Sequence, residues 1–199
     1  MEFEIRVGAA EIIKQGTELR IRDPYKDAVY RVEEDSTVDL IPVPPLHVPT
    51  KITNCLYLKL VRPLVISKGG EFWVKAPYEL AVTVDGTVVD VVTPFRVKYA
   101  LHGDIVDGVI CRYFETDVFD EMPGEGFEAL MKVVFEKTSS ATLYSYIVVP
   151  IEGAEIFEYE GRYFFETVKV RKEAAGIFGY PTKSPPVEGA WRIQRTLRI

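Results

Sequence analysis

Residues 2–7 read Glu-Phe-Glu-Ile-Arg-Val, so that charged and apolar side chains alternate at every position. Successive side chains of a β-strand point to opposite faces, and this two-residue period therefore predicts a strand with one buried and one wet face. The stretch 17–22 repeats the pattern, with Leu19 and Ile21 between charged residues. The same period recurs along almost the whole chain and decides the fold class.

Further runs rich in β-branched and aromatic residues follow at short intervals. They cover residues 27–33, 37–43, 54–61, 71–76, 78–84, 87–92, 94–102, 108–119, 129–138, 142–149, 154–159, 161–171 and 190–199. Helix-forming residues occur together only at 124–131, and the side-chain alternation that follows them favours a strand instead. Closely spaced strands without intervening helical patterns predict an all-β fold, specifically an antiparallel two-sheet β-sandwich.

Domain organisation follows from the proline-rich stretches at 41–49 and 181–186, both of which are expected to be extended, unpaired backbone. We expect residues 1–199 to form a single all-β domain. The first stretch marks a possible boundary between an N-terminal β-ribbon, 1–40, and the sandwich, 41–199. It could link these two parts or cross from one sheet to the other, and crossing is favoured.

Composition narrows the classes of partner. A net charge of −6 and a pI near 5.1 argue against nucleic-acid binding, which needs a basic face, and against an anionic membrane surface. The longest apolar runs are about eight residues, short of the roughly 20 that span a bilayer. The first residues carry acidic groups where a secretory signal carries basic ones, and this predicts a cytoplasmic protein.

Amide side chains are scarce, with Asn at position 54 and Gln at 15 and 194, whereas Glu, Lys and Arg are plentiful. This bias is typical of proteins from heat-loving organisms. Cys55 and Cys111 lie in apolar strand-like runs, where buried free thiols are the favoured prediction for a cytoplasmic protein. A disulfide between the two cysteines is the alternative prediction, because intracellular proteins of hyperthermophiles do contain disulfides.

No cofactor-binding or catalytic motif is present, and two histidines are too few for a multi-histidine metal site. We therefore expect no cofactor and no metal. His47 lies in the first proline-rich stretch and is expected to be a surface or hydrogen-bonded loop residue. His102 heads a loop in which Asp104 or Asp107 could orient it as a base, with Cys111 as nucleophile. Turn formation is the commoner role of such Asp and Gly residues.

Glu115 and Asp117 share one strand face, close enough for a hard cation to bridge them, although an acidic face that meets only solvent is commoner. Trp73 and Trp191 could form a flat platform for sugar rings, although aromatics on strands are ordinarily core residues. The candidate ligand or interface residues are His102, Asp104, Asp107, Arg112, Glu115 and Asp117.

Four stretches carry a resemblance to a known family: residues 48–58, 76–82, 99–103 and 108–113. Together they resemble an archaeal family known as domain of unknown function 432, over residues 40–120. The resemblance implies an archaeal source, and it brings no established activity and no catalytic residues. Within it, the run Gly-Val-Ile-Cys-Arg makes Arg112 the first position to test.

The function predicted from these observations is binding. We expect an interaction module for a protein partner or for a second copy of the chain, through an edge strand or an exposed sheet face. One alternative is a hydrolase-type enzyme using the loop and strand at 102–112. The other is a small-ligand or carbohydrate-binding module. Overall, a binding role is favoured over an enzymatic one.

Overall fold

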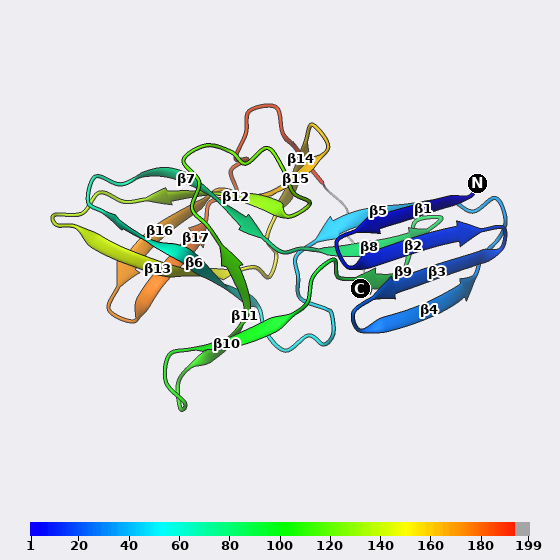
Figure 1. The fold of residues 1–199 in the computed structure, drawn as a ribbon, viewed down its shortest axis with the longest axis horizontal. Coiled ribbons are helices and arrows are strands. Elements are labelled where there is room, and N and C mark those ends of the chain that lie inside the picture. Colours follow the sequence, from blue (N-terminus) through cyan, green and yellow to red (C-terminus); the bar gives the residue numbers. More distant parts are fainter. Residues whose placement is uncertain (194–199) are drawn as a thin grey trace. The chain divides into compact units, whose positions relative to one another are not determined.

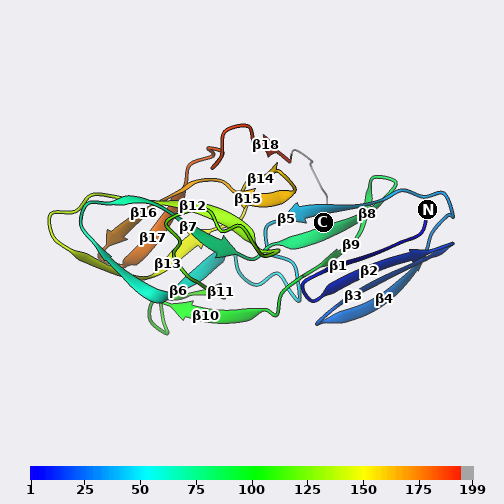
Figure 2. The ribbon, with the colours of Figure 1, turned by 45° about the horizontal axis from the view of Figure 1, so that its top comes forward.

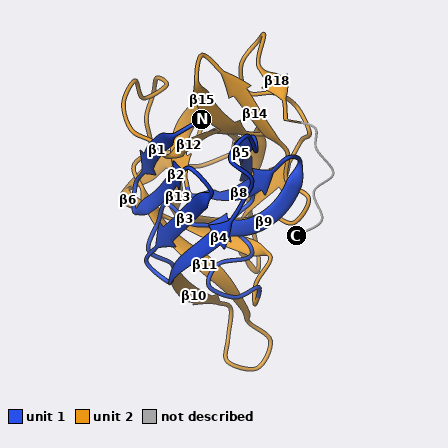
Figure 3. Ribbon diagram, turned by 90° about the vertical axis from the view of Figure 1, so that its right-hand side faces the viewer, with its two compact units in different colours: residues 1–51, 77–97, 194–199 blue, residues 52–76, 98–193 orange. Residues whose placement is uncertain are grey.

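The computed structural model describes residues 1–193, and these contain strands and loops but no helix. The all-β prediction is therefore confirmed (Figure 1). The described chain divides into two compact units, the first of residues 1–51 and 77–97 and the second of residues 52–76 and 98–193 (Figure 3). The expectation of a single domain with a possible boundary at residue 40 stays a prediction.

Unit 1 contains two antiparallel sheets. The four-stranded sheet follows the chain order, with β1 (Phe3–Val7), β2 (Ala10–Gln15), β3 (Glu18–Asp23) and β4 (Lys26–Arg31) side by side (Figure 2). The three-stranded sheet has β8 (Glu79–Val84) between β5 (Val38–Val43) and β9 (Thr87–Val92). Five of the six residues of β8 are buried, Glu79 among them.

Cross-strand register explains why alternation was a reliable guide in the four-stranded sheet. Ile5, Ile12, Ile21 and Ala28 face one another in a row across the four strands. The neighbouring row holds Arg6, Glu11, Arg22 and Asp27 on the opposite face. Its charges alternate in sign and form ion pairs of 3.0 to 3.7 Å, exposed contacts that each add little stability.

β2 was not predicted, because its core face includes a lysine. Lys14 is only 1% exposed, and its ammonium group donates hydrogen bonds to the carbonyls of Met1, Gly16 and Glu34 at 3.4, 3.1 and 2.7 Å. A long stem packs with apolar neighbours while the charged end reaches carbonyls at the end of the sheet. Because a charged residue stands at a buried position, the sequence of β2 does not show the alternation of apolar and polar residues by which the other strands were predicted.

Unit 2 contains one large mixed sheet, and this is where the finer fold prediction is not confirmed. Its order is β10-β11-β6-β13-β17-β16-β12-β15-β14-β18, and β7 also pairs with β12. The bounds are β6 (Cys55–Ile66), β7 (Gly70–Ala76), β10 (Lys98–His102), β11 (Val109–Thr116), β12 (Ala129–Phe135), β13 (Thr142–Pro150), β14 (Ile156–Tyr159), β15 (Arg162–Phe165), β16 (Val168–Glu173), β17 (Gly176–Pro181) and β18 (Trp191–Arg192). Four of its pairings are parallel, β6–β11, β12–β15, β12–β16 and β13–β17. Side-chain alternation is the same in either strand direction, so it could not reveal them.

Several predicted strands differ in extent from those of the structure, among them the runs 161–171 and 190–199. The run 161–171 is interrupted at Glu166, which is 1% exposed and accepts hydrogen bonds from the amides of Glu155 and Lys183 at 2.8 and 2.9 Å. The carboxylate of Glu166 thus joins two loops at a point where the strand would have continued. Of the run 190–199, only Trp191–Arg192 forms a described strand, and residues 194–199 lie outside the described part of the chain.

Cys55 and Cys111 form a disulfide, so the favoured prediction of free thiols is wrong. The two residues lie side by side on the parallel strands β6 and β11, since Arg112 is in register with Leu56, and their Cα atoms are 4.8 Å apart. Both are buried, at 7% and 0% exposed. Two buried cysteines on adjacent strands are only recognised as a pair once the strand order is known, and no spacing in the sequence gives it.

We expect the double variant C55A/C111A to lose about 2–4 kcal/mol of unfolding free energy, because the disulfide closes a long loop in the unfolded chain. Denaturant unfolding followed by fluorescence measures this loss. Alkylation of the unreduced, denatured protein serves as the control and should modify neither cysteine. Full alkylation without reductant would show that the bond is not formed.

Candidate functional site

The candidate residues from the sequence lie on and beside the β10–β11 hairpin, but they do not form one shared set of contacts. The His102 ring packs against Tyr57, Tyr146 and Phe178, with ring centroids 6.3, 5.4 and 5.4 Å away. Tyr57 in turn stacks between Tyr113 and Tyr146, almost parallel to both. His102 therefore belongs to an aromatic cluster around the disulfide, and no acidic residue among its described contacts orients it as a base.

Asp104 and Gly108 build the turn of the hairpin. The Asp104 carboxylate accepts hydrogen bonds from the amides of Val106 and Asp107 at 2.8 and 2.7 Å, and these bonds hold its pKa below the usual value. A Cβ atom on Gly108 would lie 2.2 Å from the Asp104 carbonyl oxygen. Position 108 therefore requires glycine, and Asp104 acts here in turn formation, with Asp107 exposed beside it.

The remaining candidates point elsewhere. Arg112 is 3% exposed and lies in register with Tyr99, on the face of the hairpin opposite His102. Glu115 accepts a hydrogen bond from the Tyr113 hydroxyl at 2.8 Å. Asp117 pairs with the Arg62 guanidinium at 2.6 Å, which lowers the pKa of that carboxyl. No group of three or more potential metal ligands occurs among residues 1–193, and the six candidates do not meet at one point.

The hairpin does gather exposed apolar side chains. Of the eighteen large apolar residues that are exposed in the described chain, six lie between positions 99 and 110: Tyr99, Leu101, Ile105, Val106, Val109 and Ile110. We call residues 98–112 the hairpin arm. Ile105 and Val106, at its tip, are 93% and 87% exposed. Figure 1 shows this loop extending away from the other strands of unit 2.

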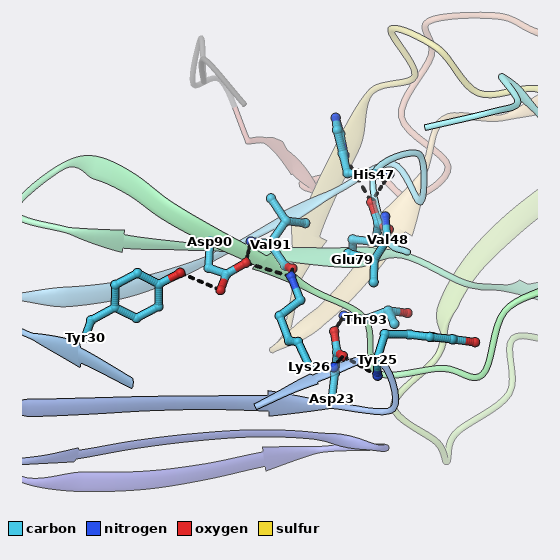
Figure 4. A network of polar contacts seen from close by, with 10 residues as sticks. All are labelled: Asp23, Tyr25, Lys26, Tyr30, His47, Val48, Glu79, Asp90, Val91 and Thr93. Atoms are coloured by element: carbon cyan, nitrogen blue, oxygen red, sulfur yellow. Dashed lines mark hydrogen bonds and ion pairs between the residues drawn. The ribbon is translucent and has the colours of Figure 1, made fainter. Parts of the chain in front are cut away.

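A second polar site lies in unit 1 and was not predicted. The Glu79 carboxylate is fully buried and accepts hydrogen bonds from the amides of Leu46, His47 and Val48 at 2.9, 2.8 and 2.6 Å. Figure 4 shows Glu79 beside His47 and Val48. The Nδ1 atom of His47 also lies 3.0 Å from Glu79. Four hydrogen bonds to one carboxylate explain how a charge is tolerated in a central strand.

The proline-rich sequence explains this arrangement. Prolines at 42, 44, 45 and 49 have no amide hydrogen, so residues 46–48 hold the longest run of donors in the stretch. Glu79 accepts hydrogen bonds from all three amides, and the Leu46 amide also donates to the Pro44 carbonyl at 2.9 Å. The expectation of unpaired backbone in this stretch is therefore wrong for residues 46–48, and it is also wrong for residues 41–43, which pair with β8 as part of β5. It is wrong in the second stretch as well, at residues 181–182, where β17 ends and the next amide donates to the Thr167 carbonyl. Position 79 reads in sequence as one more polar residue at a strand end.

Asp90 organises the other side of this site. Its Oδ1 atom accepts hydrogen bonds from the Lys26 ammonium at 2.7 Å and from the Val91 amide at 2.8 Å, and its Oδ2 atom accepts one from the Tyr30 hydroxyl at 2.8 Å. The Lys26 ammonium also donates to the Val91 carbonyl. Burial and the Asp90 charge raise the pKa of Tyr30 to about 12. Both sheets of unit 1 are thereby joined through β4 and β9.

A pocket of about 310 Å³ lies between these groups, lined by Lys26, His47, Val48, Pro49, Val88, Val89, Asp90 and Val91. Asp90 has both oxygens occupied and neutralises Lys26, and Glu79 occupies the Nδ1 atom of His47. Valine and proline form the walls, and none of the lining residues is a serine, threonine or cysteine. The pocket therefore combines apolar walls with three ionisable side chains, those of Lys26, His47 and Asp90.

Neither site assembles a nucleophile, a base and an orienting acid, and none of the described residues forms a helix that could cross a membrane. By fold and site, the chain is an all-β protein distinguished by a projecting apolar hairpin. The model of the family described as protein of unknown function (DUF432) matches residues 3–197, and the chain belongs to that family. The resemblance seen over 40–120 is thus confirmed and extends to nearly the whole chain. No curated protein and no solved structure matches the chain.

We expect Glu79→Gln to lower the unfolding free energy by about 1.5–3 kcal/mol, because charge-assisted hydrogen bonds are replaced and an amide group then faces a backbone donor. Amide hydrogen exchange at residues 46–48 should become faster. As the matched control, His47→Ala removes only the ring contact and should leave Leu46 and Val48 protected. Unchanged exchange in Glu79→Gln would contradict the role assigned to this carboxylate.

A second prediction concerns pH. Because its pKa is raised when folded, Tyr30 contributes stability that is complete below the unfolded value of about 10 and is lost as the pH rises toward 12. Asp90→Asn removes the neighbouring charge, so the Tyr30 pKa should fall toward 10. Titration of the tyrosine ring-carbon chemical shifts measures this change. Tyr163, whose raised pKa owes nothing to Asp90, is the internal reference.

Proposed function

We propose that this protein is a protein-association module and that the hairpin arm is its docking element. The observation that supports this is the apolar exposure at the tip, where Ile105 and Val106 are 93% and 87% exposed. Burying such side chains in a partner is favourable by about 25 cal/mol for each Å² of apolar surface removed from water. Single exposed apolar residues are ordinary on protein surfaces, whereas six on one short hairpin are characteristic of an interaction site.

Rigidity supports the same proposal. The tip is fixed by the Asp104 turn, and the strands are fastened to unit 2 by the Cys55–Cys111 disulfide and by the packing of His102 in the aromatic cluster. A docking element that is ordered before it binds loses less conformational entropy on association. The apolar tip thus belongs to a hairpin that is held in place by the rest of unit 2, as expected for a preformed interface.

A cytoplasmic location is part of this proposal. The acidic composition gives no general affinity for nucleic acid or for anionic lipid, which leaves proteins as the expected class of partner. A disulfide in a cytoplasmic protein is characteristic of hyperthermophiles. The amide-poor composition of this chain agrees with such a source.

Photo-crosslinking tests the proposal. A photoreactive residue in place of Val106 should form discrete covalent adducts in cells that produce the protein. The same residue in place of Val29, which is 56% exposed on β4, is the matched control and should form none. The variant I105E/V106E should abolish association yet change the unfolding free energy by no more than about 0.5 kcal/mol, because both side chains already face water.

Equal labelling at positions 106 and 29, or no adduct at either position, would contradict a docking role for the hairpin arm. Loss of stability in I105E/V106E would contradict it as well, because the tip would then be part of the fold of its own chain.

A further inference from the structure

The outer edge of β10 is a second feature of the hairpin arm. β10 is the first strand of the large sheet, and within residues 1–193 it pairs only with β11. No other backbone hydrogen bond is formed by residues 98–102 among the described contacts. The edge therefore presents backbone donors and acceptors that are open to another strand. It has no bulge and no proline, and its one lysine, Lys98, lies at the end of the strand and not in the middle of the edge.

We infer that the occupant of this edge is β10 of a second copy of the chain, paired antiparallel about a two-fold axis at Ala100. This inference rests on the proposed function and names its partner. In that register Tyr99 of each copy faces Leu101 of the other, Lys98 faces His102, and the two Ala100 residues meet. The smallest side chain of the strand thus lies where two identical side chains must share space.

Charge selects this arrangement over a parallel one. β10 begins with Lys98, and the acidic residues Asp104 and Asp107 follow shortly after its end at His102. Antiparallel pairing brings Lys98 of one copy toward the acidic turn of the other, twice. Parallel pairing would place like charges side by side at both ends. The lowered pKa of Asp104 keeps its carboxyl charged throughout the neutral range.

The side chains on the two faces of β10 fit the same register. Tyr99 and Leu101 lie on one face, where their neighbours on β11 are Arg112 and Ile110. The Arg112 side chain is buried within its own copy, so it adds no charge to the pairing edge. Pairing of the two copies would extend the Leu101–Ile110 pair into a stripe with Tyr99 of the second copy. On the other face, His102 turns into its own aromatic cluster and leaves room for Lys98 of the second copy.

The pairing is closed. Each copy has one β10 edge, and a two-fold contact uses both, so that association stops at a dimer instead of continuing into a fibre. A five-residue edge with its flanking side chains is a small interface, at the low end of the range for specific complexes, and a dissociation constant of the order of micromolar is expected.

Sedimentation of the purified full chain over a range of concentrations around that value tests the inference. Monomer and dimer should interconvert with concentration. Leu101→Lys places a charge on the strand edge and should leave only monomer. Leu143→Lys is the matched control, since Leu143 is similarly exposed, at 53% against 50%, on β13 away from the hairpin arm, and it should still form dimers.

Engineered disulfides test the register. In a mixture of Tyr99→Cys and Leu101→Cys chains, the new cysteines should face each other at about 5 Å between Cα atoms and form a covalent dimer under mild oxidation. Either variant alone places its cysteines two positions apart along the strands, at roughly 8 Å, beyond disulfide range. Efficient linkage of one variant with itself would overturn the register.

The outcomes separate this inference from the proposed function. A chain that stays monomeric at all concentrations, yet forms adducts with another protein through position 106, would overturn the second-copy pairing and leave the docking role in place. A dimer that Leu101→Lys does not disrupt would overturn the assignment to β10.

Discussion

Every strand in this protein depends on partners that are supplied by other segments of the chain. A helix satisfies its own amides and carbonyls, whereas a strand leaves them to its neighbours, and buried backbone groups cannot stay unpaired. The described residues form no helix, so their backbone groups must find hydrogen-bond partners on other segments. The large sheet meets this requirement by combining parallel and antiparallel neighbours. Where the chain cannot pair with a strand, buried side chains take over, as Glu79 does for residues 46–48 and Glu166 does between two loops.

The alternation of side chains was sufficient to predict the fold class and most strand positions, because a half-buried strand imposes that pattern locally. The alternation could not predict the direction or the order of the strands, since β6 pairs with β11 and β13, which are distant in sequence. Buried polar residues were the other source of error. Lys14 hid a strand, and Glu166 divided one, because each is held by backbone groups that are distant in sequence.

The candidate residues illustrate the same limit. His102 and Asp104 were singled out from a correctly located loop, yet their partners are rings from three other strands in one case and the turn itself in the other. The exposure of that loop had not been recognised, since the sequence does not show whether the apolar loop residues Ile105 and Val106 pack against the chain or face water. The site at Glu79 had one usable signal, the spacing of the prolines, which shows where backbone donors are left.

The two units are interleaved along the chain, and this affects synthesis on the ribosome. The four-stranded sheet is complete once residue 31 has emerged, because its strands follow one another. β5 must wait for β8, which emerges only after β6 and β7, and those two strands in turn lack their partners until β11, β12 and β13 have been made. A nascent chain paused in between would expose several unpaired strands at once, so a newly made copy has particular need of chaperone protection during that interval.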